Sequence, residues 1–102
     1  MNNLKQYLID EIKKDVTAKD LEISESDKDI EILSGKLKVE RKASTMKDMP
    51  DELREDFKYS LLALEGMFST EQKRNLELKT DLKVLRFREA VIESQFPSGD
   101  LD

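Results

Sequence analysis

Pairs of carboxylates are the first residues in this sequence whose type and spacing could do chemistry. Glu11 with Asp15 and Asp27 with Glu31 are each four residues apart, which places both members on one face of a helix. Two such groups can act as acid and base when burial separates their pKa values. These pairs stand among other charged residues, where that separation is not expected. We therefore interpret them as surface charge.

A calcium site is the second possibility, because Asp27 and Asp29 have the spacing of the first two ligands of a calcium-binding loop. Such a loop also needs glycine at its sixth position and glutamate at its twelfth, and this sequence has neither. The chain has no histidine and no cysteine, which excludes zinc fingers, disulfides and nucleophile pairs built on imidazole. We expect no metal site, no cofactor and no enzymatic activity.

A basic stretch between residues 73 and 88 could follow a phosphate backbone. A net charge of −5 opposes binding to nucleic acid, and Phe87 is the only aromatic residue within the stretch. Several of the bases flank an apolar seam, where such residues pair with acids on a neighbouring helix. We therefore expect no nucleic-acid partner. We interpret four of these bases as the rim of a coiled coil: Arg74, Lys79, Arg86 and Arg88.

The helices that position these side chains can be predicted from the length, the composition and the positions of the prolines. The sequence has 102 residues, of which 37% are hydrophobic and 40% charged, a balance typical of long solvated helices. Pro50 divides it into two arms of similar length, and Pro97 follows the second. We predict a single all-α helical-hairpin domain with arms at 2–47 and 51–96, a turn at 48–50 and a disordered tail at 97–102. No apolar run is long enough for a membrane span, so we expect a cytoplasmic protein.

The second arm carries the alternating three and four spacing of a coiled-coil seam. Nine of its twelve seam positions are apolar, and Glu71, Asn75 and Glu89 occupy the others. Acidic residues after Pro50 complement the positive start of a helix. The sequence therefore predicts one long helix over 51–96, with these apolar seam residues: Phe57, Leu61, Leu64, Phe68, Leu78, Leu82, Leu85, Ile92 and Phe96.

The first arm admits two interpretations between residues 29 and 40. One is a β-hairpin with Ser34-Gly35 as its turn, and the other is a helix that tolerates Gly35 at a cost of about 1 kcal/mol. We favour the helix, because an isolated two-stranded ribbon is marginally stable. We expect a break in the arm near 17–26. Before it we predict a helical apolar face formed by Leu4, Tyr7, Leu8, Ile12 and Val16.

Folding the chain at Pro50 brings the two seams level and sets acidic runs beside basic ones. Ser26 then meets Glu71, and we expect weak packing at this polar middle. Beyond residue 78 the second arm carries an additional apolar stripe, Val84, Phe87 and Val91, that one neighbouring helix cannot cover together with the seam. We expect a partner-binding surface at Leu78, Leu82, Val84, Leu85, Phe87, Val91, Ile92 and Phe96.

Two functional hypotheses follow. The favoured one is a non-enzymatic assembly or adaptor protein that acts through coiled-coil contacts with a protein partner, a homo-oligomer or both. The alternative is a small acidic regulator or inhibitor of a cellular machine, of the kind that viral accessory proteins provide. It would present the acidic residues between 20 and 31 to a basic cleft as a mimic of phosphate.

Overall fold

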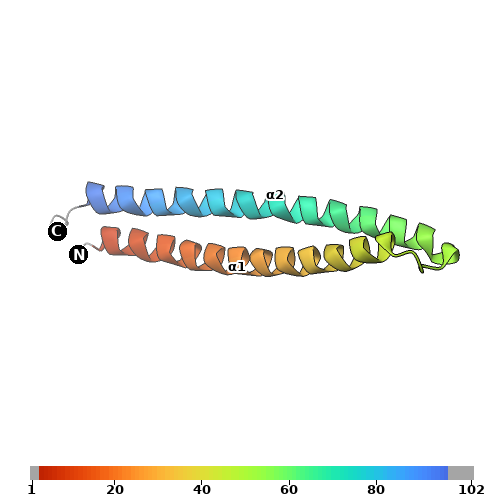
Figure 1. Cartoon of the computed structure of the whole chain (residues 1–102). Coiled ribbons are helices and arrows are strands. Elements are labelled where there is room, and N and C mark those ends of the chain that lie inside the picture. The colour runs from red at the N-terminus through yellow and green to blue at the C-terminus, as the bar shows by residue number, and fades with distance from the viewer. Residues whose placement is uncertain (1–2, 97–102) are drawn as a thin grey trace. The chain divides into compact units, whose positions relative to one another are not determined.

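The computed structural model describes residues 3–96 and contains two α-helices joined by a turn (Figure 1). Helix α1 spans Leu4–Thr45 and helix α2 spans Asp51–Gln95. Residues 46–50 connect them, and the described part of the chain has no strand. The predicted all-α helical hairpin is confirmed, with a turn that begins two residues earlier than expected. Residue 2 and the predicted tail at 97–102 lie outside the described residues.

Local sequence accounts for the places where the helices begin and end. Asn3 precedes α1, and its carbonyl oxygen accepts the Tyr7 amide at 2.8 Å. Thr45 ends α1 with its hydroxyl donating to the carbonyl oxygen of Lys42. Pro50 precedes α2 and accepts the Leu53 amide at 3.0 Å, so its missing N–H costs no hydrogen bond. Three of the four helix boundaries, the two ends of α1 and the start of α2, therefore have a local hydrogen bond beside them.

Contacts group the chain into two units, each described by itself. Unit 1 contains residues 3–24 and 76–96 of the described chain, and unit 2 contains residues 25–75. In each unit a stretch of α1 lies antiparallel beside a stretch of α2. The expectation of a single domain stays a prediction. Within residues 3–96, neither helix is apolar enough over a sufficient length to cross a membrane.

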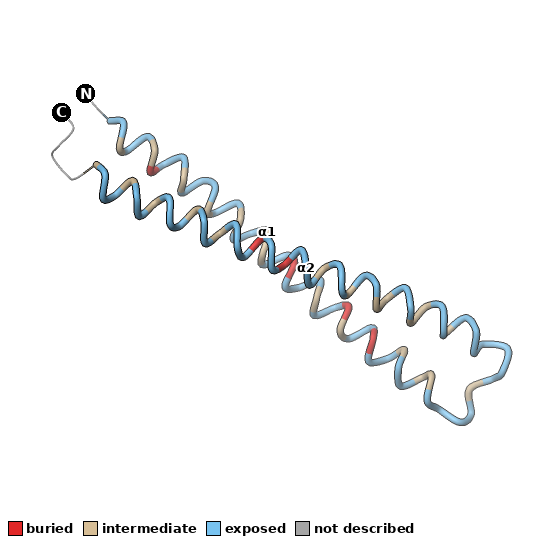
Figure 2. The backbone as a smooth tube through the Cα atoms, turned by 90° about the horizontal axis from the view of Figure 1, so that it is seen from above, coloured by how far each residue is buried: buried red, intermediate tan, exposed pale blue. Residues whose placement is uncertain are grey.

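The core of each unit is a single seam between its two helical stretches (Figure 2). All twelve seam positions predicted for α2 are buried or half-buried. In α1 a matching repeat of threes and fours passes through Ile9, which is only 5% exposed and was not on the predicted face. The most buried apolar side chains of the described chain are Ile9, Leu33, Leu37 and Leu78.

The predicted break near 17–26 is wrong, because α1 is continuous through these residues. Serine and threonine weaken a helix when their side chains compete for its backbone hydrogen bonds. Ser26 does not compete, since its hydroxyl is fully buried and donates to Glu71 on α2. Residues 29–40 are also helical, so the helix is confirmed there and the β-hairpin alternative is wrong.

The predicted apolar face at the start of α1 is correct in part. Leu8, Ile12 and Val16 are half-buried, but Leu4 is 51% and Tyr7 60% exposed. The repeat through Ile9 turns these two residues away from the seam.

Replacing Leu37 with Ala tests the importance of the seam. Leu37 is 2% exposed, so its loss removes apolar burial and leaves a cavity. We expect Leu37→Ala to lower the free energy of unfolding by about 2 to 5 kcal/mol in urea denaturation followed by circular dichroism. Leu62→Ala is the matched control, because Leu62 is 56% exposed. Equal losses for the two variants would contradict the seam as the stabilising element.

Candidate functional site

Five of the eight predicted partner-binding residues belong to the seam of unit 1. Leu78 is 7% exposed, and the other four are half-buried: Leu82, Leu85, Ile92 and Phe96. A side chain that already packs between α1 and α2 offers little of its surface to another molecule. These five residues therefore hold α1 and α2 together and are not themselves an accessible partner-binding surface.

The other three predicted residues form an exposed row along α2, here called the outer stripe. Val84 is 43%, Phe87 70% and Val91 41% exposed. Steps of three and then four residues keep them on one face of the helix. Phe87 is the most exposed of the large hydrophobic side chains in the described chain. The outer stripe is thus separate from the seam and accessible.

A shallow groove of about 440 Å³ lies beside Val84 in unit 1. Leu85 and Ala18 line it from the two helices, and charged groups surround them. Lys19 bridges two of these charges, with its Nζ 3.3 Å from Glu22 and 3.7 Å from Asp81. The groove therefore combines a small apolar floor with a polar rim, which is the composition of a protein contact surface.

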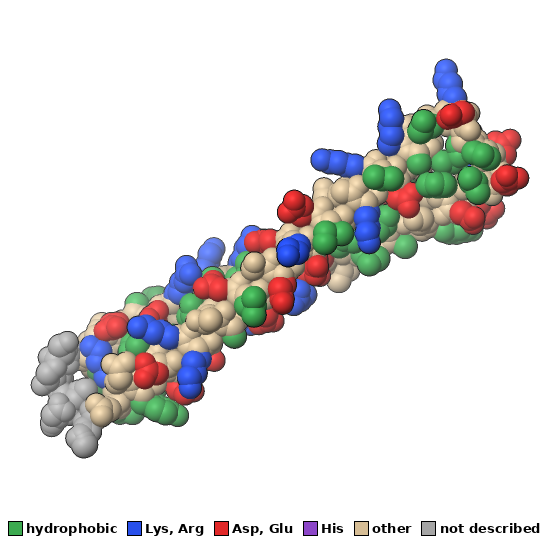
Figure 3. Space-filling model, turned by 90° about the horizontal axis from the view of Figure 1, so that it is seen from below, with side chains coloured by type: hydrophobic (Ala, Val, Ile, Leu, Met, Phe, Trp, Pro, Cys, Tyr) green, Lys and Arg blue, Asp and Glu red, His purple; other side chains and the backbone are tan. Residues whose placement is uncertain are grey.

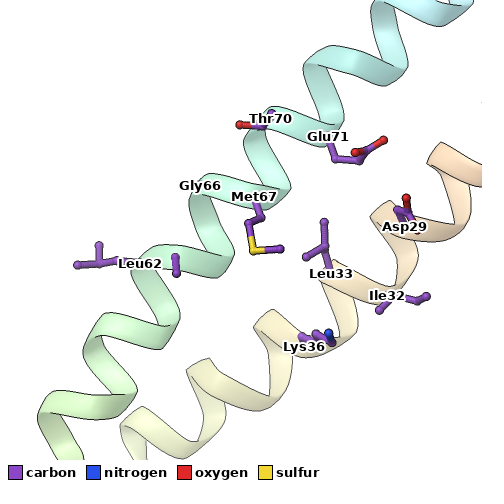
Figure 4. Close-up of a pocket in the computed structure, with 10 residues that line it drawn as sticks. Asp29, Ile32, Leu33, Lys36, Leu62, Gly66, Met67, Thr70 and Glu71 are labelled. Atoms are coloured by element: carbon purple, nitrogen blue, oxygen red, sulfur yellow. The ribbon is translucent and has the colours of Figure 1, made fainter.

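Unit 2 holds a second exposed apolar region that the sequence reasoning missed. Ile32, Leu62 and Met67 are about half exposed and line a groove of about 650 Å³ (Figure 4). In the close-up, Leu33 and Met67 point toward each other between the two helices. Hydrophobic side chains also gather near the turn on the face shown in Figure 3. The sequence does contain a pattern that indicates this region, because Ile32, Val39 and Met46 recur every seven residues outside the seam.

A chain of hydrogen-bonded polar groups, of which Ser26 and Asn75 are buried, joins α1 to α2 in unit 2. Asn75 Nδ2 donates to Ser26 Oγ at 3.1 Å and to Asp27 Oδ1 at 2.8 Å. Ser26 Oγ donates in turn to Glu71 Oε2 at 2.6 Å, and Arg74 Nη1 donates to the same oxygen at 2.8 Å. Ser26 is 0% and Asn75 5% exposed, so both polar side chains are buried, and the expectation of weak packing at the polar middle stays a prediction. Complementary hydrogen bonds allow these polar side chains to be buried.

Glu71 is held ionised by this arrangement. The hydrogen bond from Ser26 lowers the pKa of Glu71 below its ordinary value of 4.5, and the hydrogen bond and charge of Arg74 act in the same direction. Partial desolvation opposes them by raising the pKa. The net lowering means that the bonded carboxylate, rather than the carboxylic acid, is the stable form within the fold.

Of the bases predicted to form a coiled-coil rim, Arg86 has an acidic partner on the neighbouring helix as expected, whereas the ion pair of Arg74 lies within its own helix. Arg86 lies 3.8 Å from Asp20 on α1, and Arg74 pairs with Glu71 on its own helix. Within residues 3–96, no three acidic side chains lie close enough together to hold a metal ion. Comparison with known proteins found no matching family model, no matching curated protein and no matching solved structure.

Removing the Glu71 carboxylate should change how stability depends on pH. Because its pKa is lower in the folded than in the unfolded state, ionised Glu71 stabilises the fold above pH 4.5, and this contribution is lost as pH falls through the lowered value. We expect Glu71→Gln to lose less unfolding free energy than the unmodified protein between about pH 6 and about pH 3. Urea denaturation at each pH measures the difference.

Glu77→Gln is the control, because Glu77 is an exposed glutamate of the same helix. It should keep the pH dependence of the unmodified protein. If Glu71→Gln and Glu77→Gln gave the same dependence, the bonded carboxylate at Glu71 would not contribute to stability.

Proposed function

We propose that this chain is a non-enzymatic assembly or adaptor protein that binds a protein partner through the outer stripe of Val84, Phe87 and Val91. The observation that supports the proposal is the exposure of these three side chains along one face of α2. The seam of the same helix packs against α1, so the outer stripe is a second apolar surface on a helix that is already paired. Extended exposed apolar surfaces on proteins in water mark contacts with other molecules.

The chemistry of the outer stripe favours a helix as the partner element. Residues at steps of three and four match the spacing of side chains on a facing amphipathic helix. Phe87 supplies a large apolar anchor, and the groove beside Val84 can receive a side chain of the partner. Asp15, Glu22 and Arg88 at the groove provide charges that orient the partner. The apolar contacts supply the affinity.

The alternative, an acidic mimic of phosphate, has less support. Asp20 lies 3.8 Å from Arg86, and Glu22 lies 3.3 Å from Lys19. Asp27 accepts a hydrogen bond from Asn75. Two members of the acidic row therefore already pair with bases of this chain and a third is hydrogen-bonded, which leaves these carboxylates less accessible to a basic cleft. The favoured proposal needs no such free charge.

Changing the outer stripe should separate the two proposals. We expect the double variant Phe87→Gln with Val91→Gln to reduce capture of the protein partner by about tenfold or more, because burial of each side chain contributes about 1.5 to 3 kcal/mol. Raising the salt from about 0.1 to 1 M should have little effect on the unmodified protein, since apolar burial is not screened. Affinity capture with quantitative mass spectrometry measures both effects.

Leu21→Gln is the control, since Leu21 is 61% exposed in unit 1 and lies on α1 rather than on the outer stripe. It should leave capture unchanged. Capture that survives the double variant but disappears in 1 M salt would overturn the proposal and favour the acidic mimic.

A further inference from the structure

Gly35 is an exposed glycine in the interior of α1 that the packing of the chain does not explain. A Cβ atom built at this position would meet no other atom within 4 Å. Glycine in a helix costs stability relative to alanine, and no neighbour within the described chain requires the missing side chain. Glycine on a helix surface does allow the backbone or side chain of another molecule to approach closely. Gly35 is therefore a gap on the outside of the helix.

Apolar side chains stand on both sides of this gap. Ile32 precedes Gly35 by three residues and is 48% exposed, while Val39 follows by four and is 67% exposed. A groove of about 810 Å³ runs beside them and is completed by Ser60 and Leu64 from α2. The surface thus presents a protruding side chain, a gap and a second protruding side chain in succession along one face of α1.

The charges around Gly35 change sign at the same point. Exposed acids precede Ile32 at positions 25, 29 and 31, and exposed lysines follow Gly35 at positions 36, 38 and 42. The ion pairs seen in unit 2 join Arg41 to Glu65, Arg54 to Asp51 and Arg74 to Glu71, and involve none of these six residues. Lys28 and Glu40 break the order of charges. The Glu40 carboxylate accepts a hydrogen bond from Ser60 on α2.

This order of charges is complementary to itself when a second α1 lies antiparallel. We infer that a second copy of this chain packs on the face around Gly35, with the two α1 helices related by a two-fold axis between residues 32 and 35. Each Ile32 then fills the gap at Gly35 of the other copy. The same register places Asp29 beside Lys36 along one edge of the contact, Glu31 beside Lys38 along the other edge, and Glu25 level with Lys42, each pair between copies.

A two-fold axis explains why the occupant is a second copy. The axis makes every contact occur twice, so the dimer has two Ile32 side chains in two gaps and six charge pairs. The stem of Lys28 lies beside Val39 of the other copy in this register and covers it. The inference adds to the proposed function and uses different residues, because the outer stripe takes no part in the contact.

Charge exchange tests this pairing directly. One variant carries Glu25→Lys, Asp29→Lys and Glu31→Lys, and a second carries Lys36→Glu, Lys38→Glu and Lys42→Glu. Each should raise the dissociation constant for self-association by about tenfold or more, because every cross-copy pair becomes repulsive. Mixing the two variants in equal amounts should restore association as a mixed dimer. Analytical ultracentrifugation with one variant labelled measures both results.

Filling the gap provides a second test that does not depend on charge. Gly35→Leu should raise the melting temperature of the helix, because the new side chain meets nothing within the chain, and should weaken self-association. Gly66→Leu is the matched control. Gly66 is also an exposed helical glycine with open space at its Cβ position, but it lies on α2. It should raise the melting temperature and leave self-association unchanged.

Several results would overturn the pairing. These are a monomer over a hundredfold range of concentration, charge-exchange variants that associate as the unmodified protein does, or a mixture that stays monomeric. Weakening by Gly66→Leu equal to that by Gly35→Leu would also overturn it. The outer stripe takes no part in the pairing, so capture of a protein partner by an unmodified chain that stays monomeric would contradict this inference and leave the proposed function intact.

Discussion

The burial of one seam between two helices is the constraint on which this structure depends. Neither α1 nor α2 can be stable in water with its apolar row exposed, because most of the stability of a protein helix comes from the packing of one face. The seam is one row deep on each helix, and most of its residues are only half-buried. Each seam residue therefore contributes individually to stability, and the remaining faces of the helices are left for other contacts.

Within unit 2 the seam contains polar residues that bury less apolar surface but specify the register of α1 against α2. Ser26, Glu71 and Asn75 occupy positions where leucine or isoleucine would bury more apolar surface. Their hydrogen bonds satisfy one another only when α1 and α2 are in one register. A shift by one turn would leave a buried hydroxyl and a buried amide without these partners, at a cost of about 1 to 3 kcal/mol for each group. The polar layer thus selects the register that the apolar residues alone would specify less strictly.

Much of this fold could be predicted from the sequence, because the repeat of α2 is regular over its whole length. The first arm was harder to predict. Leu4, Tyr7 and Leu8 lie close enough to Ile9 that two faces fit the apolar pattern, and only pairing with α2 selects the face containing Ile9. Helix α1 is continuous through Ser26, whose hydroxyl donates to Glu71, a residue far away in the sequence. A prediction from the helix propensity of serine and its sequence neighbours does not include that hydrogen bond.

The candidate surfaces show the same limit. The outer stripe was predictable because Phe87 and its neighbours repeat beside a strong seam. The sequence alone allows Ile32 and Val39 to be strand residues of a β-hairpin, and Gly35 to be its turn or an interior residue of a helix. Their exposure on one helical face becomes clear only when Leu33 and Leu37 are known to face α2. Which side of a helix is outside depends on its partner as much as on its own residues.

The position of the turn has a consequence for how the protein folds. Contacts near residues 46–50 join residues close in sequence, such as Glu40 with Ser60 at a separation of 20, whereas Ser26 and Glu71 are separated by 45. Closing a short loop costs less chain entropy than closing a long one. Pairing that starts at the turn therefore makes each later contact the closure of a small additional loop. We expect the two helices to assemble by zipping from the turn, with the ion pair between Lys5 and Glu93 among the last contacts to form.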